Sequence, residues 1–269
     1  MIRFSKYMWL YFLISGLVLF SGVYSLVRYG LKPSIDFSGG TLIEFTTTKE
    51  LPKSANIQKV GKNHYILRTK EKSVIKDNET VLRKETVGPI LGKELLKKAM
   101  FAAILAISAI LLYVAYAFKN IKFGVAAVIA LLHDLLVILG SFSLLGHFFG
   151  VEVDTLFVTA FLTTMSFSVH DTIVVFDRIR EYLKRDRSRP FEDLCDIALT
   201  ETINRSMTNS FTIIFMLMAL VLMGGETTKW FVVALLIGTV SGTYSSPFIA
   251  TPVLLLWDRW EKRKFRKVV

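Results

Sequence analysis

Long uncharged stretches separated by short charged ones dominate the pattern of hydrophobic and polar positions along the chain. Spanning about 30 Å of hydrocarbon takes roughly 20 apolar residues at about 1.5 Å of helical rise each. Six stretches have that length: 7–27, 99–118, 123–151, 155–176, 206–225 and 230–257. Two of them, 123–151 and 155–176, are interrupted only by a His–Asp pair. We therefore predict an α-helical polytopic membrane protein with six transmembrane helices. The first stretch is too long for the apolar region of a signal peptide and lacks a small-residue cleavage site, so we expect it to remain as an anchor.

The segment 30–98, between the first two predicted helices, is long enough to form a small domain. Residues rich in β-branched and aromatic side chains, which strands favour, fall in three stretches: 35–48, 64–69 and 80–87. The polar stretches 51–63 and 70–79 are predicted to be loops. Adjacent glycines, Gly39 and Gly40, indicate a bulge or a close approach of two chain segments. We expect a small α+β domain here.

Composition narrows the class of protein. The chain of 269 residues is 52% hydrophobic, yet its formal charge is +11. Such a high apolar content excludes a disordered or nucleic-acid-binding tail protein, so we expect no nucleic-acid partner. A single cysteine, Cys195, excludes an intrachain disulfide framework.

Basic residues in the short connections predict the orientation, because Lys and Arg of such connections stay in the cytoplasm. They number 17 on one side of the predicted helices and one on the other. The basic side comprises the N-terminus, 119–122, 177–205 and the tail after residue 258, and the other side comprises 150–154 and 224–229. Both termini are therefore expected in the cytoplasm. The resulting organisation is an N-terminal helix 1–29, an exterior domain 30–98, a helical region 99–257 with a cytoplasmic loop 177–205, and a basic tail 258–269. Within that loop, the amphipathic stretch 191–204 is expected to lie along the cytoplasmic face.

Two carboxylates fall inside predicted membrane helices, where an ionisable group is costly and is by default a functional candidate. They are Asp134 in the third helix and Asp171 in the fourth. Thr164, Ser168 and Asp171 follow at spacings of four and three, so they share one helix face. Such a stripe suits a hydrated proton or ion path. The alternative is that Asp171, and equally Asp134, is a structural residue hydrogen-bonded to a neighbouring helix.

Arg205 is the expected counter-charge for Asp171 at the start of the fifth helix. Its side chain stays charged at any accessible pH, so pairing with a carboxylate could gate protons. The alternative is a snorkelling anchor at the helix end. In the sixth helix, Gly238 and Gly242 form a G-x-x-x-G spacing that favours close helix packing, and Pro247 permits a bend.

Motifs of common enzymes are missing from the sequence. No G-x-S-x-G or H-E-x-x-H occurs, and residues 88–93 have the wrong spacing for a phosphate-binding loop. His133, His147 and His170 do not sit at metal-ligand spacing, so no metal site is predicted. We expect neither catalysis nor a cofactor.

Five motifs, in order along nearly the whole chain, together resemble one known family. They are IDFSGG (35–40), VGPILGKEL (87–95), HDLLVI in the third helix, VHDTIVVFDRIRE (169–181) and INRSMTNS (203–210). The chain resembles the SecF branch of the SecD/SecF family of protein-export membrane proteins, which is related to the RND transporter superfamily. The stretch between the first two motifs is shorter than in well-known members, so the resemblance implies a reduced ferredoxin-like exterior domain.

The resemblance also implies a function, a location and partners. It implies a subunit of the inner membrane that uses the proton-motive force to assist polypeptide export. The implied partners are a SecD-like subunit, the SecYEG translocon, YidC and YajC, together with the exported polypeptide and membrane lipid. Asp171 and Arg205 match the family's ion path, with a further carboxylate supplied by SecD. Asp36, Gly39 and Gly40 belong to the family's exterior motif, whereas His170 is implied only to border the path.

Two other functions are compatible with the same pattern. One is an RND-like proton-coupled exporter of a small molecule or lipid, for which a pocket in the exterior domain would be expected. The other is a passive scaffold in which Asp171 and Arg205 join two helices without conducting ions. In the scaffold, loss of either partner would destabilise the fold by leaving a buried charge unpaired.

Overall fold

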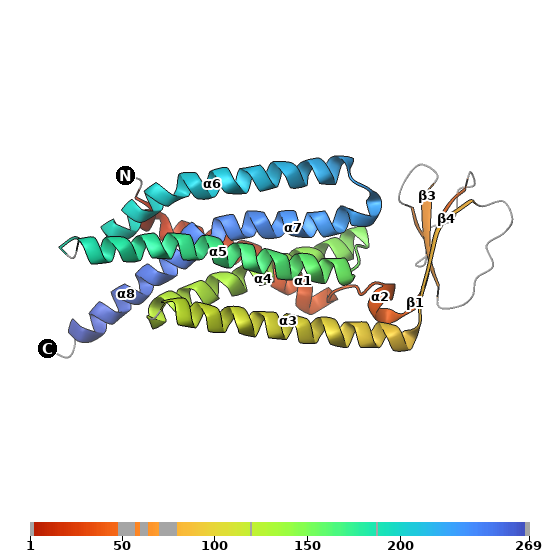
Figure 1. Ribbon diagram of the computed structural model, residues 1–269, viewed down its shortest axis with the longest axis horizontal. Coiled ribbons are helices and arrows are strands. Elements are labelled where there is room, and N and C mark those ends of the chain that lie inside the picture. The colour runs from red at the N-terminus through yellow and green to blue at the C-terminus, as the bar shows by residue number, and fades with distance from the viewer. Residues whose placement is uncertain are drawn as a thin grey trace. The chain divides into compact units, whose positions relative to one another are not determined.

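The structure is a computed structural model that describes residues 3–47, 57–59, 64–69, 80–118, 120–186 and 188–266. The chain forms two compact units (Figure 1). The larger, helical unit comprises Met1–Leu31, Ile104–Val151 and Leu156–Val269. The smaller comprises Lys32–Ala103 and Glu152–Thr155. Each unit is described separately.

The described residues contain six helices long and apolar enough to cross a membrane, so this prediction is confirmed. A short 3-10 turn, η1 (Phe4–Tyr7), comes first. The long helices are α1 (Met8–Tyr29), α3 (Pro89–Phe118), α4 (Ile121–Phe149), α5 (Thr155–Arg185), α6 (Phe191–Met223) and α7 (Glu226–Ser245). A π-helical turn, η2 (Ser246–Ala250), joins α7 to α8 (Thr251–Arg266). The span that crosses α7, η2 and α8 runs over Thr227–Arg263.

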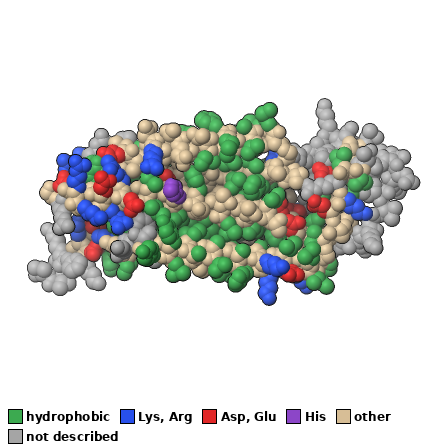
Figure 2. Space-filling view, in the orientation of Figure 1, with side chains coloured by type: hydrophobic (Ala, Val, Ile, Leu, Met, Phe, Trp, Pro, Cys, Tyr) green, Lys and Arg blue, Asp and Glu red, His purple; other side chains and the backbone are tan. Residues whose placement is uncertain are grey.

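The central helices of the larger unit are α4, α5 and α7–α8, whose apolar windows are at least half buried, whereas α1, α3 and α6 are mostly exposed. Phe123, Phe176 and Met165 belong to the buried core of this unit. Large apolar side chains such as Phe20 on α1 and Leu222 on α6 are exposed, as lipid-facing side chains should be. Figure 2 shows hydrophobic side chains over the middle of the helices and charged ones gathered at the end where α5 and α6 are joined.

Local sequence explains where the helices begin and end. Asn120 caps α4, its side chain accepting a hydrogen bond from the Lys122 N–H at 3.2 Å. Gly150 ends α4 in the left-handed conformation (φ 69°), which glycine adopts at little cost. Pro247 lies in the π-helical turn and has no N–H to donate, so the expected single helix 230–257 is interrupted there. Figure 1 shows the change of direction between α7 and α8.

The prediction of a cytoplasmic loop over 177–205 is wrong in its secondary structure. Helix α5 continues to Arg185 and α6 begins at Phe191, so 191–204 is part of a 33-residue helix and not a separate stretch. The uncharged windows give membrane-spanning length but not helix length, because a helix can continue beyond the apolar window with polar side chains that are exposed to water and can pair with one another. Arg178, for example, pairs with Glu181 on its own helix and with Glu201 on α6.

The smaller unit is built on a four-stranded antiparallel sheet of order β2-β3-β1-β4. The strands are β1 (Gly40–Thr46), β2 (Ile57–Lys59), β3 (His64–Thr69) and β4 (Thr80–Val87). Ile43 and Phe45 of β1 pack with Tyr65 of β3 in its buried core. Strand β3 lies between β1 and β2, as in the split arrangement of ferredoxin-like folds. The predicted strands 64–69 and 80–87 are confirmed, and the predicted loop 70–79 lies outside the described residues.

Two predictions for this unit are wrong in detail. The predicted strand 35–48 begins instead with a helical turn, α2 (Ile35–Ser38), because the Ser34 hydroxyl accepts from the Asp36 N–H and caps it. The predicted loop 51–63 contains β2, which pairs with β3 through Gln58↔Ile66. The strand has only three residues, too few to show an alternation of apolar and polar side chains in this polar stretch.

Candidate ion-coupling site

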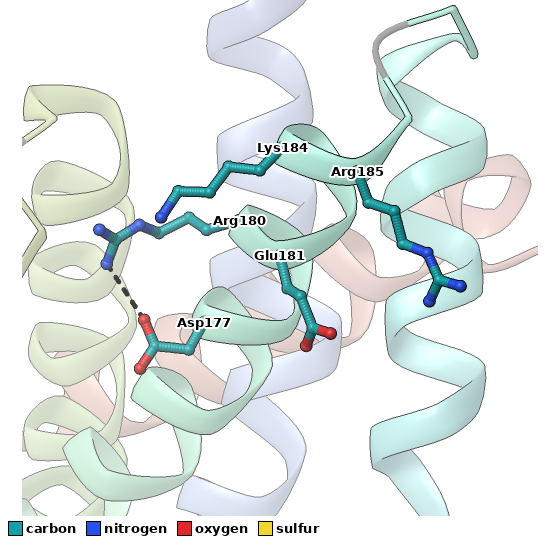
Figure 3. Close-up of a pocket in the computed structure, with 5 residues that line it drawn as sticks. All are labelled: Asp177, Arg180, Glu181, Lys184 and Arg185. Atoms are coloured by element: carbon teal, nitrogen blue, oxygen red, sulfur yellow. Dashed lines mark hydrogen bonds and ion pairs between the residues drawn. The ribbon is translucent and has the colours of Figure 1, made fainter.

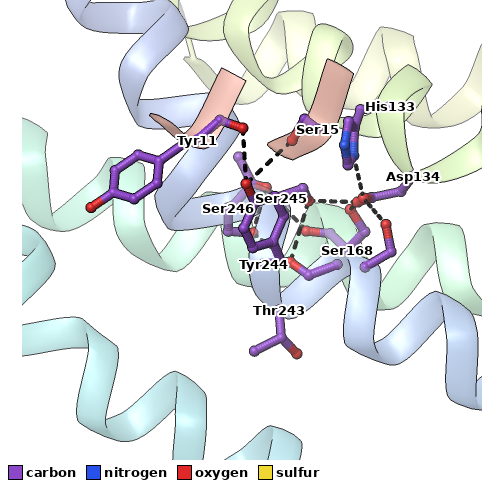
Figure 4. Close-up of polar contacts among 12 residues, drawn as sticks. Tyr11, Ser15, His133, Asp134, Ser168, Thr243, Tyr244, Ser245 and Ser246 are labelled. Carbon is purple, nitrogen blue, oxygen red and sulfur yellow. Dashed lines mark hydrogen bonds and ion pairs between the residues drawn. The ribbon is translucent and has the colours of Figure 1, made fainter. Parts of the chain in front are cut away.

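Asp134 lies at the centre of a buried polar cluster contributed by three helices (Figure 4). Its side chain is almost fully buried in α4. Ser168 of α5 donates to Asp134 Oδ2 at 2.5 Å, Ser245 of α7 donates to the same oxygen at 2.6 Å, and Ser241 of α7 donates to Oδ1 at 2.6 Å. His133 Nδ1 lies 3.1 Å from Oδ1. Three hydroxyl donors compensate the desolvation of a buried carboxylate, which would otherwise be very costly.

Close packing of α5 against α7 brings these hydroxyls to Asp134. A Cβ added at Gly238 would lie 2.3 Å from Thr164 Cγ2, and one added at Gly242 would lie 3.1 Å from Ser168 Cβ. The two glycines therefore allow α7 to approach the hydroxyl stripe of α5 closely. The Thr164 hydroxyl itself donates to the Phe161 carbonyl at 3.0 Å.

Asp171 lies one helical turn beyond Ser168 and has a different environment. The Ser206 hydroxyl of α6 donates to its Oδ1. Its Oδ2 is buried without a hydrogen-bond partner. The next residue, Thr172, is 2.9 Å from Ser246 in the π-helical turn, oxygen to oxygen. Asp171 therefore has spare capacity to bind a proton or to accept a further donor.

The structure does not bring Asp171 and Arg205 into an ion pair: no contact within 4.0 Å joins them in this part of the described chain. Arg205 is exposed on α6, while its neighbour Ser206 is buried and meets Asp171. Helix α6 begins well before Arg205, so this residue is not at a helix end. The sequence thus identified the correct stretch of α6, but the adjacent residue makes the contact.

The predicted stripe on α5 divides between two carboxylates. Ser168 donates a hydrogen bond to Asp134, whereas Asp171 accepts one from Ser206 of α6. His170 is exposed and lines a cavity of about 310 Å³ together with Tyr113 of α3. It therefore lies beside the cluster and not within it.

The remaining histidines have separate roles. The His147 ring stacks on the Tyr29 ring, with centroids 3.7 Å apart. His133 is buried, and its Nε2 has no hydrogen-bond partner. The described residues hold no group of three His, Cys, Asp or Glu side chains that could bind a metal ion.

Sequence reasoning did not identify the serines and threonine that complete the site: Ser206, Ser241, Ser245, Ser246 and Thr172. One signal was available. Ser241 and Ser245 are four residues apart and therefore share a face of α7. Their target, Asp134, lies more than 100 positions earlier and could be found only from the fold.

The joined ends of α5 and α6 form a second, charged surface. Asp177, Arg180, Glu181, Lys184 and Arg185 line a cavity of about 440 Å³ there (Figure 3). Arg180 pairs with Asp177 at 3.1 Å within the same helix. In the connection to α6, the Ser188 hydroxyl bonds to the Asp186 carboxylate and holds its pKa below the usual value. Exposed pairs of this kind contribute little to stability and mark a hydrated helix end.

The glycine motif of the smaller unit performs a packing role. A Cβ on Gly39 would lie 2.7 Å from Pro89 Cα, and one on Gly92 would lie 2.9 Å from the Gly39 nitrogen. The close approach predicted from Gly39–Gly40 is therefore present, and Gly39 and Gly40 both have positive φ. Asp36 Oδ2 accepts from the Thr155 N–H at 3.2 Å and from its hydroxyl at 2.9 Å. Asp36 thereby accepts from an N–H of the first turn of α5, where the helix itself offers no acceptor.

Six helices long and apolar enough to cross a membrane, two of which carry a carboxylate within their apolar part, define a multi-pass membrane protein. The family model "Protein export membrane protein SecD/SecF, C-terminal" matches residues 67–260, and the model "SecD/SecF GG Motif" matches residues 24–50. The chain belongs to the SecD/SecF family.

Relatives are similar over nearly the whole chain. A protein translocase subunit SecF from Thermobaculum terrenum is 39% identical over 96% of this chain and 94% of its own length. Protein translocase subunit SecDF from Bacillus subtilis is 30% identical over 94% of this chain and 38% of its own length. A crystal structure of SecDF from Thermus thermophilus, described as a translocon-associated membrane protein, superposes with a TM-score of 0.85 at 28% identity. That match covers 96% of this chain and 39% of the SecDF chain.

Proposed function

We propose that this protein is the SecF subunit of a Sec-associated complex that uses the proton-motive force to assist polypeptide export. The observation that carries the proposal is Asp171, a carboxylate within a membrane helix that has one buried oxygen unpartnered. In a family of translocase subunits, such a group is suited to accept and release a proton during a transport cycle. Moving one elementary charge through the membrane potential supplies about 2.3 kcal/mol per 100 mV.

The partners follow from the same membership. The SecDF relatives join a region similar to this chain, 38–39% of their length, to further sequence, and this supports a SecD-like subunit as the partner. SecYEG is the translocon partner of this proposal, and YidC and YajC are further companions. Both termini lie in the cytoplasm, and the smaller unit meets the emerging polypeptide outside.

Arg205 acts in this proposal as a charge that approaches Asp171 in another state of the cycle. The Ser206–Asp171 contact shows that α6 already lies next to the carboxylate. The Arg205 side chain is exposed, so it is free to move. A modest movement of α6 relative to α5 would exchange a hydroxyl partner for a guanidinium. Pairing would favour the ionised carboxylate and release its proton.

The test is Asp171→Asn in the assembled complex, with Asp177→Asn as the matched control on the same helix. Asp177 is an exposed carboxylate two helical turns farther along α5. We expect Asp171→Asn to lower proton-dependent export about tenfold or more, corresponding to about 1.4 kcal/mol in the barrier, while Asp177→Asn retains it.

Thermal unfolding of both variants separates this function from its rivals. A scaffold role predicts that Asp171→Asn loses stability together with export, whereas a folded variant that fails in export supports ion coupling. Undiminished export by Asp171→Asn, with loss of small-molecule efflux, would instead favour the RND-like exporter.

A further inference from the structure

We propose that Asp134 and Asp171 act as one coupled pair of proton-holding carboxylates, linked through the consecutive hydroxyls of Ser245 and Ser246 at the π-helical turn. This inference rests on the proposed function and adds a second proton-holding residue to it. Of the pair, Asp134 is the more deeply buried and carries more hydrogen bonds. A structural role alone would leave unexplained why one of its donors, Ser245, has a second acceptor within reach.

The first step concerns Ser245. Its hydroxyl donates to Asp134 Oδ2 at 2.6 Å, and the Gly242 carbonyl oxygen lies 3.3 Å away as an alternative acceptor. A hydroxyl has one hydrogen and two lone pairs. When Asp134 takes up a proton, its new O–H needs an acceptor, and Ser245 Oγ can serve if its own hydrogen turns to Gly242.

The second step concerns the Gly242 carbonyl oxygen, which already accepts two hydrogen bonds. It accepts from the Ser246 backbone N–H and from the Ser246 hydroxyl at 3.2 Å. A carbonyl oxygen has two lone pairs, so a third donor displaces the weakest one. Arrival of the Ser245 hydrogen therefore frees the Ser246 hydroxyl.

The third step carries the effect to Asp171. Ser246 lies 2.9 Å from Thr172, the residue next to Asp171, so the serine pair reaches the turn of α5 that carries the second carboxylate. The freed hydroxyl thus gains a carboxylate acceptor and favours the ionised form of Asp171. Direct repulsion between two carboxylates acts in the same sense, so the pair holds one proton more readily than two or none.

Other titratable groups around the pair are few. His133 faces Asp134, and the Tyr244 ring lies 6.3 Å from the His133 ring; His170 and Arg205 are the basic groups that act on Asp171. His133 is more than nine-tenths buried, with its Nε2 unpartnered, and Asp171 Oδ2 is unpartnered as well. These two atoms without hydrogen-bond partners, one at each end of the link, are positions at which a proton can bind or leave. In each cycle one proton is bound by one carboxylate as one is released from the other.

Infrared titration of the purified full-length chain measures the coupling directly. The absorption of each protonated carboxyl is assigned by its loss in Asp134→Asn or Asp171→Asn. We expect each substitution to move the titration midpoint of the remaining carboxyl to lower pH by about one unit, a tenfold change in proton affinity. The two shifts should be equal, because coupling is reciprocal.

The serine link has its own variants. Replacing Ser245 and Ser246 together by Ala should reduce the shift to less than half. Ser241→Ala is the matched control, since Ser241 contacts Asp134 without joining it to Asp171, and it should preserve the shift. Ser245→Thr, which keeps the hydroxyl, should also preserve it. Absence of a shift, or an unchanged shift in the double serine variant, would overturn the proposal.

Proton flux through the chain reconstituted with its SecD-like partner separates this inference from the proposed function. We expect Asp134→Asn to reduce flux about tenfold. If Asp171→Asn abolishes flux while Asp134→Asn conducts normally, the coupled pair is wrong and the proposed function stands. If neither substitution affects flux, the proposed function itself fails.

Discussion

At the scale of single residues, the structure separates the exterior motif's acidic residue from the intramembrane carboxylates. Asp36 lies in the smaller unit and accepts two hydrogen bonds from Thr155, at the first turn of α5. A negative charge at a helix N-terminus is stabilised by the helix dipole as well as by the free N–H groups. Asp36 therefore caps the first turn of α5 through Thr155.

Removing this contact should destabilise the protein. We expect Asp36→Ala to lower the free energy of unfolding by about 1–3 kcal/mol, the range for hydrogen bonds to a charged group. Thr155→Val, which removes only the hydroxyl, should cost less. The measurement is thermal or denaturant unfolding of the purified protein in detergent. In a double-mutant cycle the two losses should be non-additive, and simple additivity would contradict a direct interaction.

The residue scale also shows where sequence reasoning stops. Asp134 and Asp171 could be identified because a carboxylate in an apolar helix is conspicuous at any position. The sequence could not predict to which of them Ser168 donates a hydrogen bond. A stripe of residues defines one face of a helix but not the helix that packs against that face. Arg205 was expected to contact Asp171, and the fold places Ser206 there instead.

At the scale of elements, α5 and α7 pack as closely as their side chains permit. The contact of Gly238 with Thr164 leaves no room for a methyl group. The sequence indicated a packing helix from its G-x-x-x-G spacing, but the partner helix became clear only in the fold. The ends of α5 and α6 were predicted poorly because hydropathy marks only the membrane-spanning part, and both helices continue beyond it through polar residues.

Adding one methyl group at this contact should therefore be costly. We expect Gly238→Ala to destabilise the protein by about 1–3 kcal/mol through overpacking, because the Thr164 side chain cannot move without disturbing α5. Gly16→Ala is the matched control: Gly16 is also in a membrane helix, but a Cβ there meets no atom within 4 Å. Adding Thr164→Gly to Gly238→Ala should restore part of the stability. Equal unfolding temperatures for the two single variants would contradict the close packing.

At the scale of the whole molecule, the distribution of charge along the chain predicts its orientation in the membrane. The joined ends of α5 and α6 gather exposed basic side chains, as Figure 2 shows, whereas residues 224–229, at the other end of α6, include a single basic residue, Lys229 of α7. A helix orientation that places the first of these ends in the cytoplasm follows the bias of Lys and Arg. The six-helix pattern and the separate strand-rich segment could both be predicted from the sequence because hydropathy fixes them locally. The sheet order could not, since it depends on pairing between distant strands.

This orientation predicts the accessibility of two exposed positions to a membrane-impermeant maleimide. In a Cys195→Ala background, Thr228→Cys near the start of α7 should react in intact cells, and Ser188→Cys between α5 and α6 should react only after the membrane is permeabilised. Both native side chains are exposed and belong to polar connections or helix ends, so neither substitution disturbs the core. Labelling in permeabilised cells is the control that both cysteines are reactive. The reverse pattern would place the charged ends of α5 and α6 outside and would contradict the orientation predicted from the bias of Lys and Arg.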